Sequence, residues 1–165
     1  MAARASAASD GRAVGPPAAP VCAGPIPAPL DYLEGRWELS RVIADERRAT
    51  RGRFQGTASF ERTELGLLAY TESGELELPG HRGRATRSYR YLPDGAHRFR
   101  VEFADGRAFH EGELSPDGFE TEHRCGSDRY AGRYVLGPKR RWSLSWQIAG
   151  PAKSLHIESV FERVS

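Results

Sequence analysis

The sequence has few cysteines and lacks the long apolar runs that a membrane-spanning helix needs. Its two cysteines, Cys22 and Cys125, cannot build the multiple disulfides of a small secreted domain, so we expect free thiols in a reducing compartment. No apolar stretch approaches the ~20 residues that span a bilayer, and no secretory signal core is present. These absences predict a cytoplasmic protein with no membrane partner.

The first part of the chain is poor in residues that could form a core. Residues 1–29 are mostly Ala, Pro, Gly and Ser, without apolar periodicity, and too little apolar surface is available to offset the entropy of ordering them. They predict a disordered tail, and residues 30–165 then form a single domain. An organelle-targeting peptide is the minor alternative, because the tail contains Arg and Ser but only one acid, Asp10.

A strong charge of one sign is also missing. The net charge is +2, and 22 of the 24 basic residues are arginines. Short basic clusters occur at "RRATRGR" (47–53) and "KRR" (139–141), but acidic residues are interleaved through most of the chain. A nucleic-acid partner is therefore not expected.

No stretch of ten or more residues has apolar residues at helical spacing. From residue 36 onward, apolar and polar residues instead alternate with a period of two, which is typical of β-strands. Turn sequences such as "PDGAH", "SPDG" and "CGSD" separate the alternating segments. One segment, 107–114, is ambiguous in phase. The predicted strands are 36–43, 52–62, 67–76, 86–92, 97–103, 107–114, 118–125, 128–136, 141–148 and 154–163.

Short turns between successive strands make neighbouring strands antiparallel. An open sheet of ten strands would leave two long edges exposed, and closure removes them. The sequence therefore predicts an all-β fold, a single up-and-down antiparallel β-barrel of about ten strands. A barrel of this size can enclose a small ligand.

The two ends of this domain resemble the lipocalin and wider calycin pattern. In that pattern a Gly-x-Trp near the first strand packs under an Arg from the last strand. Here "GRW" (35–37) and Arg163 match it, which implies that Trp37 and Arg163 close one end of the barrel. The alternative is an ordinary core tryptophan and a surface arginine.

The stretch "HRCGSDRY" (123–130) predicts a hairpin with polar groups at one rim of the barrel. Gly126 suits the first central position of a two-residue turn, which sets His123 opposite Tyr130 and Cys125 opposite Asp128. All four side chains then point inward, and Asp128 lies close enough to hydrogen bond to the imidazole. Cys125 is interpreted as a packing group rather than a nucleophile. The cluster is either a site or a set of satisfied structural pairs.

Further inward-facing residues are candidates for ligand binding. Aromatic side chains, Trp146 among them, would form apolar walls. Alternation places three charged side chains on the same inward face as their aromatic neighbours: Arg41, Glu72 and Arg87. They form either a structural ion pair or a group that binds the anion of a ligand. Lys153 opens the last strand and is either a ligand contact or a solvated lysine.

Three functions follow from these residues. The first is binding of a small ligand that is anionic or polar and aromatic. The second is a barrel enzyme of isomerase, cyclase or hydratase type, with His123 as general acid–base, Asp128 orienting it and Tyr130 donating to developing charge. The third is a haem-binding barrel like nitrobindin, with His110, His123 or His156 as the iron ligand. No cofactor is predicted otherwise, and the ligand spacing disfavours a metal site.

Several stretches together resemble one known family. They are "YLEGRWELSRVI" (32–43), "GRFQGTASF" (52–60), "RSYRY" (87–91), "DGRAFHEGEL" (105–114), "HRCGSDRY" (123–130) and "GPAKSLHIESVFER" (150–163). In order and spacing they resemble the family catalogued as domain of unknown function 6314, including its His-x-Cys-x-x-Asp-x-Tyr element. Ser154 departs from the acidic residue that usually follows the Lys. The resemblance implies a compact domain and no particular activity.

Overall fold

The structure is a computed structural model that describes residues 24–165. Cys22 and most of the predicted tail lie outside these residues. One short helix and ten strands make up the described part of the chain. The elements are α1 (Pro29–Leu33), β1 (Gly35–Asp45), β2 (Thr50–Arg62), β3 (Leu68–Leu78), β4 (His81–Asp94), β5 (Arg98–Phe103), β6 (Ala108–Glu113), β7 (Phe119–Cys125), β8 (Asp128–Gly137), β9 (Arg141–Ala149) and β10 (Ser154–Arg163).

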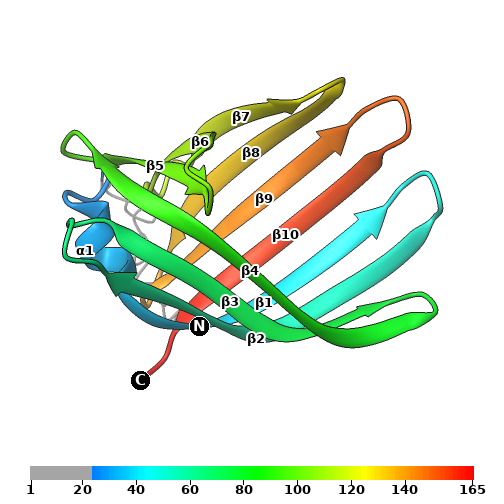
Figure 1. Cartoon of the computed structure of the whole chain (residues 1–165), viewed down its shortest axis with the longest axis horizontal. Coiled ribbons are helices and arrows are strands. Elements are labelled where there is room, and N and C mark those ends of the chain that lie inside the picture. The colour runs from blue at the N-terminus through cyan, green and yellow to red at the C-terminus, as the bar shows by residue number, and fades with distance from the viewer. Residues whose placement is uncertain (1–23) are drawn as a thin grey trace, which may run out of the picture.

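The ten strands form one antiparallel sheet that curls into a nearly closed barrel, which confirms the predicted fold (Figure 1). The order is β6-β5-β4-β3-β2-β1-β10-β9-β8-β7, so the first and last strands of the chain pair in its middle. Within residues 24–165 no ladder joins β6 to β7. We call this boundary the seam. Its two edge strands are short, which limits the unpaired backbone that an edge exposes.

The hairpin of β7 and β8 has the predicted register. His123 pairs with Tyr130 and Cys125 with Asp128. Gly126 adopts a φ of 60° at the turn, which lies in the left-handed region. A two-residue hairpin turn requires such a φ at its first central residue, and glycine reaches it without steric cost. Local turn chemistry is therefore sufficient to fix this register.

Helix α1 covers one end of the barrel, and the β1–β2, β3–β4 and β9–β10 turns lie at the other end (Figure 1). Pro29 suits the first turn of a helix, and Leu30 and Leu33 are buried against the barrel. The segment before α1 is also ordered, because the Ile26 N–H donates to the Leu114 carbonyl at 3.0 Å and the Ala28 N–H donates to the Ala96 carbonyl at 2.9 Å. Ile26 and Ala28, counted with the tail in the sequence analysis, are thus hydrogen bonded to the residue after β6 and to the β4–β5 turn, and Pro29 begins α1.

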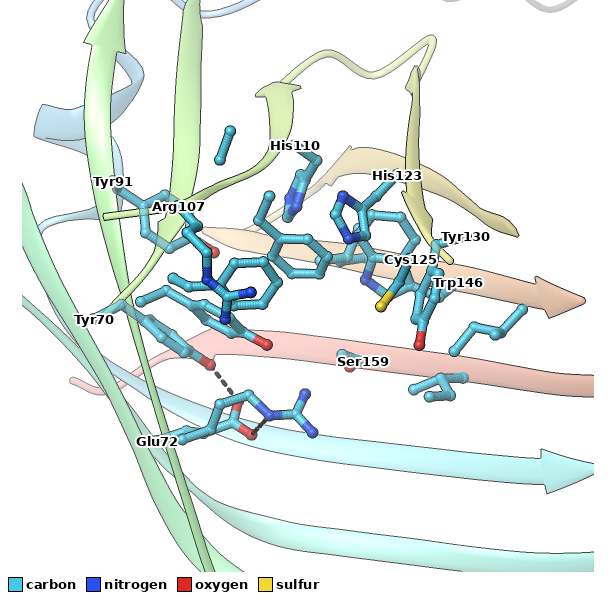
Figure 2. A pocket seen from close by; sticks show the side chains of 18 of the residues that line it. Tyr70, Glu72, Tyr91, Arg107, His110, His123, Cys125, Tyr130, Trp146 and Ser159 are labelled. Atoms are coloured by element: carbon cyan, nitrogen blue, oxygen red, sulfur yellow. Dashed lines mark hydrogen bonds and ion pairs between the residues drawn. The ribbon is translucent and has the colours of Figure 1, made fainter. Parts of the chain in front are cut away.

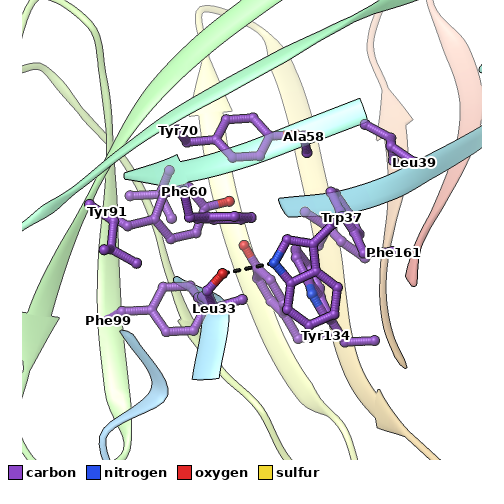
Figure 3. Packing of buried hydrophobic residues seen from close by; sticks show 14 of the residues in the cluster. Leu33, Trp37, Leu39, Ala58, Phe60, Tyr70, Tyr91, Phe99, Tyr134 and Phe161 are labelled. Carbon is purple, nitrogen blue, oxygen red and sulfur yellow. Dashed lines mark hydrogen bonds between the residues drawn. The ribbon is translucent and has the colours of Figure 1, made fainter. Parts of the chain in front are cut away.

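The barrel core beside α1 is aromatic (Figure 3). The Trp37 indole is fully buried, and its Nε1–H donates to the Leu33 carbonyl at 2.7 Å. The Arg163 guanidinium lies 4.9 Å above the Trp37 ring. Gly35 has a φ of 116°, and a Cβ there would lie 3.1 Å from the guanidinium. Glycine at position 35 thus allows the cation to lie over the indole.

Strand β6 contains a β-bulge, which explains its ambiguous phase. Val101 pairs with His110, but the next residue, Glu102, pairs with Ala108. Phe109 is therefore the extra residue of the bulge. A bulge interrupts alternation, so two consecutive side chains, Phe109 and His110, both reach the barrel interior.

Candidate functional site

The barrel contains a cavity of about 610 Å³. This volume falls within the range of small-molecule sites, which is roughly 300–1,000 Å³. Aromatic and aliphatic side chains form most of the wall, with arginines, histidines and one carboxylate set among them. The lining residues include Arg41, Tyr70, Glu72, Arg87, Tyr89, Phe103, Arg107, Phe109, His110, His123, Arg124, Cys125, Tyr130, Trp146 and Ser159.

A buried ion pair forms one side of the cavity. Arg41 donates to the two carboxylate oxygens of Glu72 at 2.7 and 2.8 Å and to the Ser159 hydroxyl at 2.8 Å. The Tyr70 hydroxyl donates to the same carboxylate (Figure 2). Burial alone would raise the pKa of Glu72, but the hydrogen bonds and charge of Arg41 outweigh it and lower this pKa. Glu72 is therefore ionised at neutral pH and its charge is matched.

Three other arginines around the cavity are more exposed. Arg107 and Arg124 pair with local carboxylates, those of Asp105 and Glu122. The only carboxylate within 4 Å of Arg87 in the described chain is Glu72, at 3.9 Å. Glu72 already accepts hydrogen bonds from Arg41 and Tyr70. The cavity lining thus carries a net positive charge, and Arg87 is the cation least neutralised by the protein.

Stacked rings form the facing wall. The Trp146 ring lies over Gly132 of the neighbouring strand, where a Cβ would come within 2.5 Å of it. Glycine at 132 thus lets the indole lie flat against β8. Phe109 stacks on Trp146 at 5.5 Å between ring centroids, with an interplanar angle of 17°.

His110 and Tyr134 connect the two sides of the seam. The His110 Nε2 and the Tyr134 hydroxyl are 2.7 Å apart. His110 Nδ1 is buried without a hydrogen-bond partner in the described residues, and the ring stands edge-on to Trp146 at 4.9 Å. Burial, with a smaller effect from His123, lowers the pKa of His110 to about 3. His110 is therefore neutral at neutral pH.

This neutral histidine predicts acid sensitivity. Unfolded His110 takes up a proton near its ordinary pKa of 6.5, whereas folded His110 resists protonation down to about 3. Because the unfolded state binds more protons in this window, stability falls as pH falls, by up to ~1.4 kcal/mol per pH unit. Urea unfolding of wild type and His110→Gln between pH 7 and 4 should give a shallower pH dependence for the variant. The exposed His156→Gln should follow wild type. Parallel curves for wild type and His110→Gln would contradict this assignment.

The predicted rim cluster is only partly brought together. His123, Cys125 and Tyr130 line the cavity, and His123 stands edge-on to Phe109 at 4.9 Å. Cys125 is a free thiol, and it is exposed rather than packed. In Figure 2 His110 and His123 face the cavity from the side opposite Tyr70 and Glu72.

Asp128 does not orient His123 as predicted. Its carboxylate pairs instead with the Lys153 ammonium at 2.7 Å, beside Gly150 in the β9–β10 turn. This hydrogen bond is the main cause of a raised Lys153 pKa. Neither residue lines the cavity, and their ion pair joins the start of β8 to the β9–β10 turn. Lys153 is thus a partner of Asp128 and not a freely solvated lysine.

Several cavity residues were not predicted as site residues. Arg107, Phe109, Arg124 and Ser159 fall in this group, and His110 was named only as an iron ligand. The ambiguous phase of 107–114 was the available signal for Phe109, since a bulge disturbs alternation. His156 is exposed, away from the cavity.

Two further properties concern the described residues as a group. Residues 24–165 contain no cluster of three or more His, Cys, Asp or Glu side chains arranged to hold a metal ion. Their one helix is too short to cross a membrane.

Comparison with known proteins places this domain in a family. Residues 33–163 match the group described as "Family of unknown function (DUF6314)". The chain belongs to the DUF6314 family. This match covers all ten strands of the DUF6314 barrel and both of its cavity walls. No curated protein matches the chain in sequence.

Solved structures align with the DUF6314 barrel at low sequence identity. An S-type phycobiliprotein lyase, CPES from Guillardia theta, has a TM-score of 0.58 and 9% identity, over 82% of this chain and 90% of that chain. EF1p2_mFAP2b bound to DFHBI has a TM-score of 0.42 and 10% identity, over 81% and 95% of the two chains. The first likeness shows a common fold.

Proposed function

We propose that this protein binds a small aromatic anion inside the barrel. The cavity carries this proposal, because stacked aromatic rings line it together with four arginines and a single carboxylate. Aromatic rings provide apolar area for a flat ligand. Arginines orient carboxylates, phosphates or sulfonates through paired N–H donors.

Arg87 is the residue we assign to the anionic group of the ligand. Arg41 is unsuitable as the main anchor, because Glu72 and Ser159 already take three of its N–H groups. The Arg87 side chain is about half exposed, with 52% of its surface accessible, so it can reach a ligand without first losing a close ion pair.

Catalysis by this barrel remains the alternative. One protein of the same fold is named a lyase, but a shared fold does not establish a shared activity. His123 and Tyr130 line the cavity, which suits an acid–base role, whereas Asp128 is engaged by Lys153. The enzyme proposal therefore loses the orienting carboxylate that gave it a mechanism.

The test compares two dyes of the same ring framework. 8-Anilinonaphthalene-1-sulfonate (ANS) carries a sulfonate, and N-phenyl-1-naphthylamine (NPN) carries none. Both should bind wild type, seen as enhanced dye fluorescence. Arg87→Gln should weaken ANS by about tenfold, the equivalent of one good hydrogen bond, and should leave NPN unchanged. Arg84→Gln, on the same strand outside the cavity, is the control and should change neither.

Two outcomes would count against the proposal. Failure of both dyes to bind wild type would remove the binding function. An equal loss of ANS affinity in Arg87→Gln and Arg84→Gln would reduce the role of Arg87 to general surface charge.

Haem is the alternative occupant that the histidines suggest. His110 and His123 reach the cavity, but the Nε2 of His110 is engaged by Tyr134. His123 is therefore the residue we would assign to the iron. A haem titration followed at the Soret band should distinguish this proposal, since His123→Ala would remove the band shift and His156→Ala would leave it intact.

A further inference from the structure

Phe109 occupies an unusual position in the barrel. It is the extra residue of the β-bulge, so no residue of β5 pairs with it. It also lies on β6, whose other edge faces the seam, where no ladder is formed within residues 24–165. Phe109 is thus held less by backbone hydrogen bonds than the other rings of the cavity wall. Bulged residues of this kind commonly aim a side chain into a functional site.

The ring of Phe109 fills the space between two walls of the cavity. It stacks on Tyr89 of β4 at 5.4 Å and 29°, and on Phe103 of β5 at 4.7 Å and 25°. It also stacks on Trp146 of β9, from the other side of the seam, at 5.5 Å and 17°. Strands β4 and β9 are separated by the seam and its edge strands. The Phe109 ring therefore stacks on aromatic side chains from both sides of the seam, where no backbone ladder is formed within residues 24–165.

A second hollow lies next to this ring. A crevice of about 400 Å³ runs along the seam between β5, β6 and β7. The crevice and the main cavity share Ala108, Phe109 and His110 as lining residues. The Phe109 side chain is therefore part of the partition between them, and the crevice lies next to it.

We propose that Phe109 is a gate that the ligand displaces: a flat aromatic ring takes its place against Trp146, and the phenyl ring moves into the seam crevice. This proposal rests on the binding function proposed above and defines the ligand more closely. The ligand has a planar ring system that stacks between Trp146 and Tyr89, with its anionic group toward Arg87. Bulky aliphatic ligands do not fit a slot shaped by stacked rings.

A substitution series at Phe109 tests the gate, because a gate and a wall predict opposite orders of affinity. Phe109→Ala and Phe109→Leu empty the slot and should bind NPN more tightly than wild type, by about tenfold for Ala. Phe109→Trp should bind it more weakly. If Phe109 is instead a contact surface, Ala and Leu weaken binding and Trp retains it. Phe103→Leu is the control, since it removes a stacked ring without emptying the slot and should weaken NPN.

Stopped-flow kinetics provides the second measurement. In wild type the observed rate of NPN binding should reach a plateau as dye concentration rises, because gate opening becomes limiting. In Phe109→Ala the rate should increase linearly over the same range. A plateau that persists in Phe109→Ala, or affinity that falls in both Ala and Leu, overturns the gate while the binding function stands. Absence of dye binding to wild type at equilibrium would instead overturn the binding function itself.

Discussion

Glu72→Gln is expected to lower the free energy of unfolding by about 3–5 kcal/mol, the usual cost of removing one partner of a buried ion pair. Glu72 has 4% of its side-chain surface exposed and Arg41 has 10%. The substitution removes the negative charge and leaves the buried Arg41 guanidinium without a matching charge. Urea denaturation at neutral pH measures the change.

Two controls separate this effect from general surface electrostatics. Glu75→Gln removes an exposed carboxylate that pairs with Arg82, and exposed pairs contribute little, so its unfolding curve should match wild type. The double variant Arg41→Met with Glu72→Leu should recover most of the loss, because it removes both buried charges. If Glu72→Gln unfolds like Glu75→Gln, the pair is not the electrostatic support of the cavity that we describe.

Trp37→Ala is expected to destabilise the barrel by a similar amount, about 3–5 kcal/mol. The indole is fully buried, and it contacts Trp142 at 6.1 Å and Tyr32 at 5.6 Å between ring centroids. Its removal leaves a void under α1 and takes away the donor to the Leu33 carbonyl. Thermal unfolding should therefore show a large decrease in Tm.

The Arg163 cation above Trp37 should contribute less to the free energy of unfolding than the indole does. Arg163→Gln removes the guanidinium and is expected to cost about 0.5–2 kcal/mol. Trp37→Phe keeps a ring and should fall between the two. If Arg163→Gln proved as damaging as Trp37→Ala, the energetics of this end would depend on the cation and not on core packing.

Much of the fold could be predicted because its determinants are local. Alternation along each segment identified ten strands, and Gly126 in a two-residue turn fixed the register of β7 and β8. Pairing of the first and last strands follows from closing a meander. The seam could not be predicted, because whether β6 and β7 pair depends on backbone geometry across the whole barrel.

The residues of the candidate site and their partners could be predicted less completely than the strands. Tyr130 and His123 follow from alternation, since it places them inside. Phe109 does not, because a bulge shifts its phase. Asp128 was assigned to His123 by proximity within one hairpin, but Lys153 reaches it from a turn 25 residues later in the chain. Competition between partners distant in sequence is not visible in a local pattern.

A crystal structure of the protein with ANS bound tests the central claim most directly. We predict the naphthalene ring stacked on Trp146 inside the barrel, the sulfonate within hydrogen-bonding distance of Arg87, and the Phe109 ring turned into the seam crevice. A dye found only on the outer surface, for example beside the exposed Val42, with the cavity side chains unchanged, would contradict the claim that this barrel is a binding site for aromatic anions.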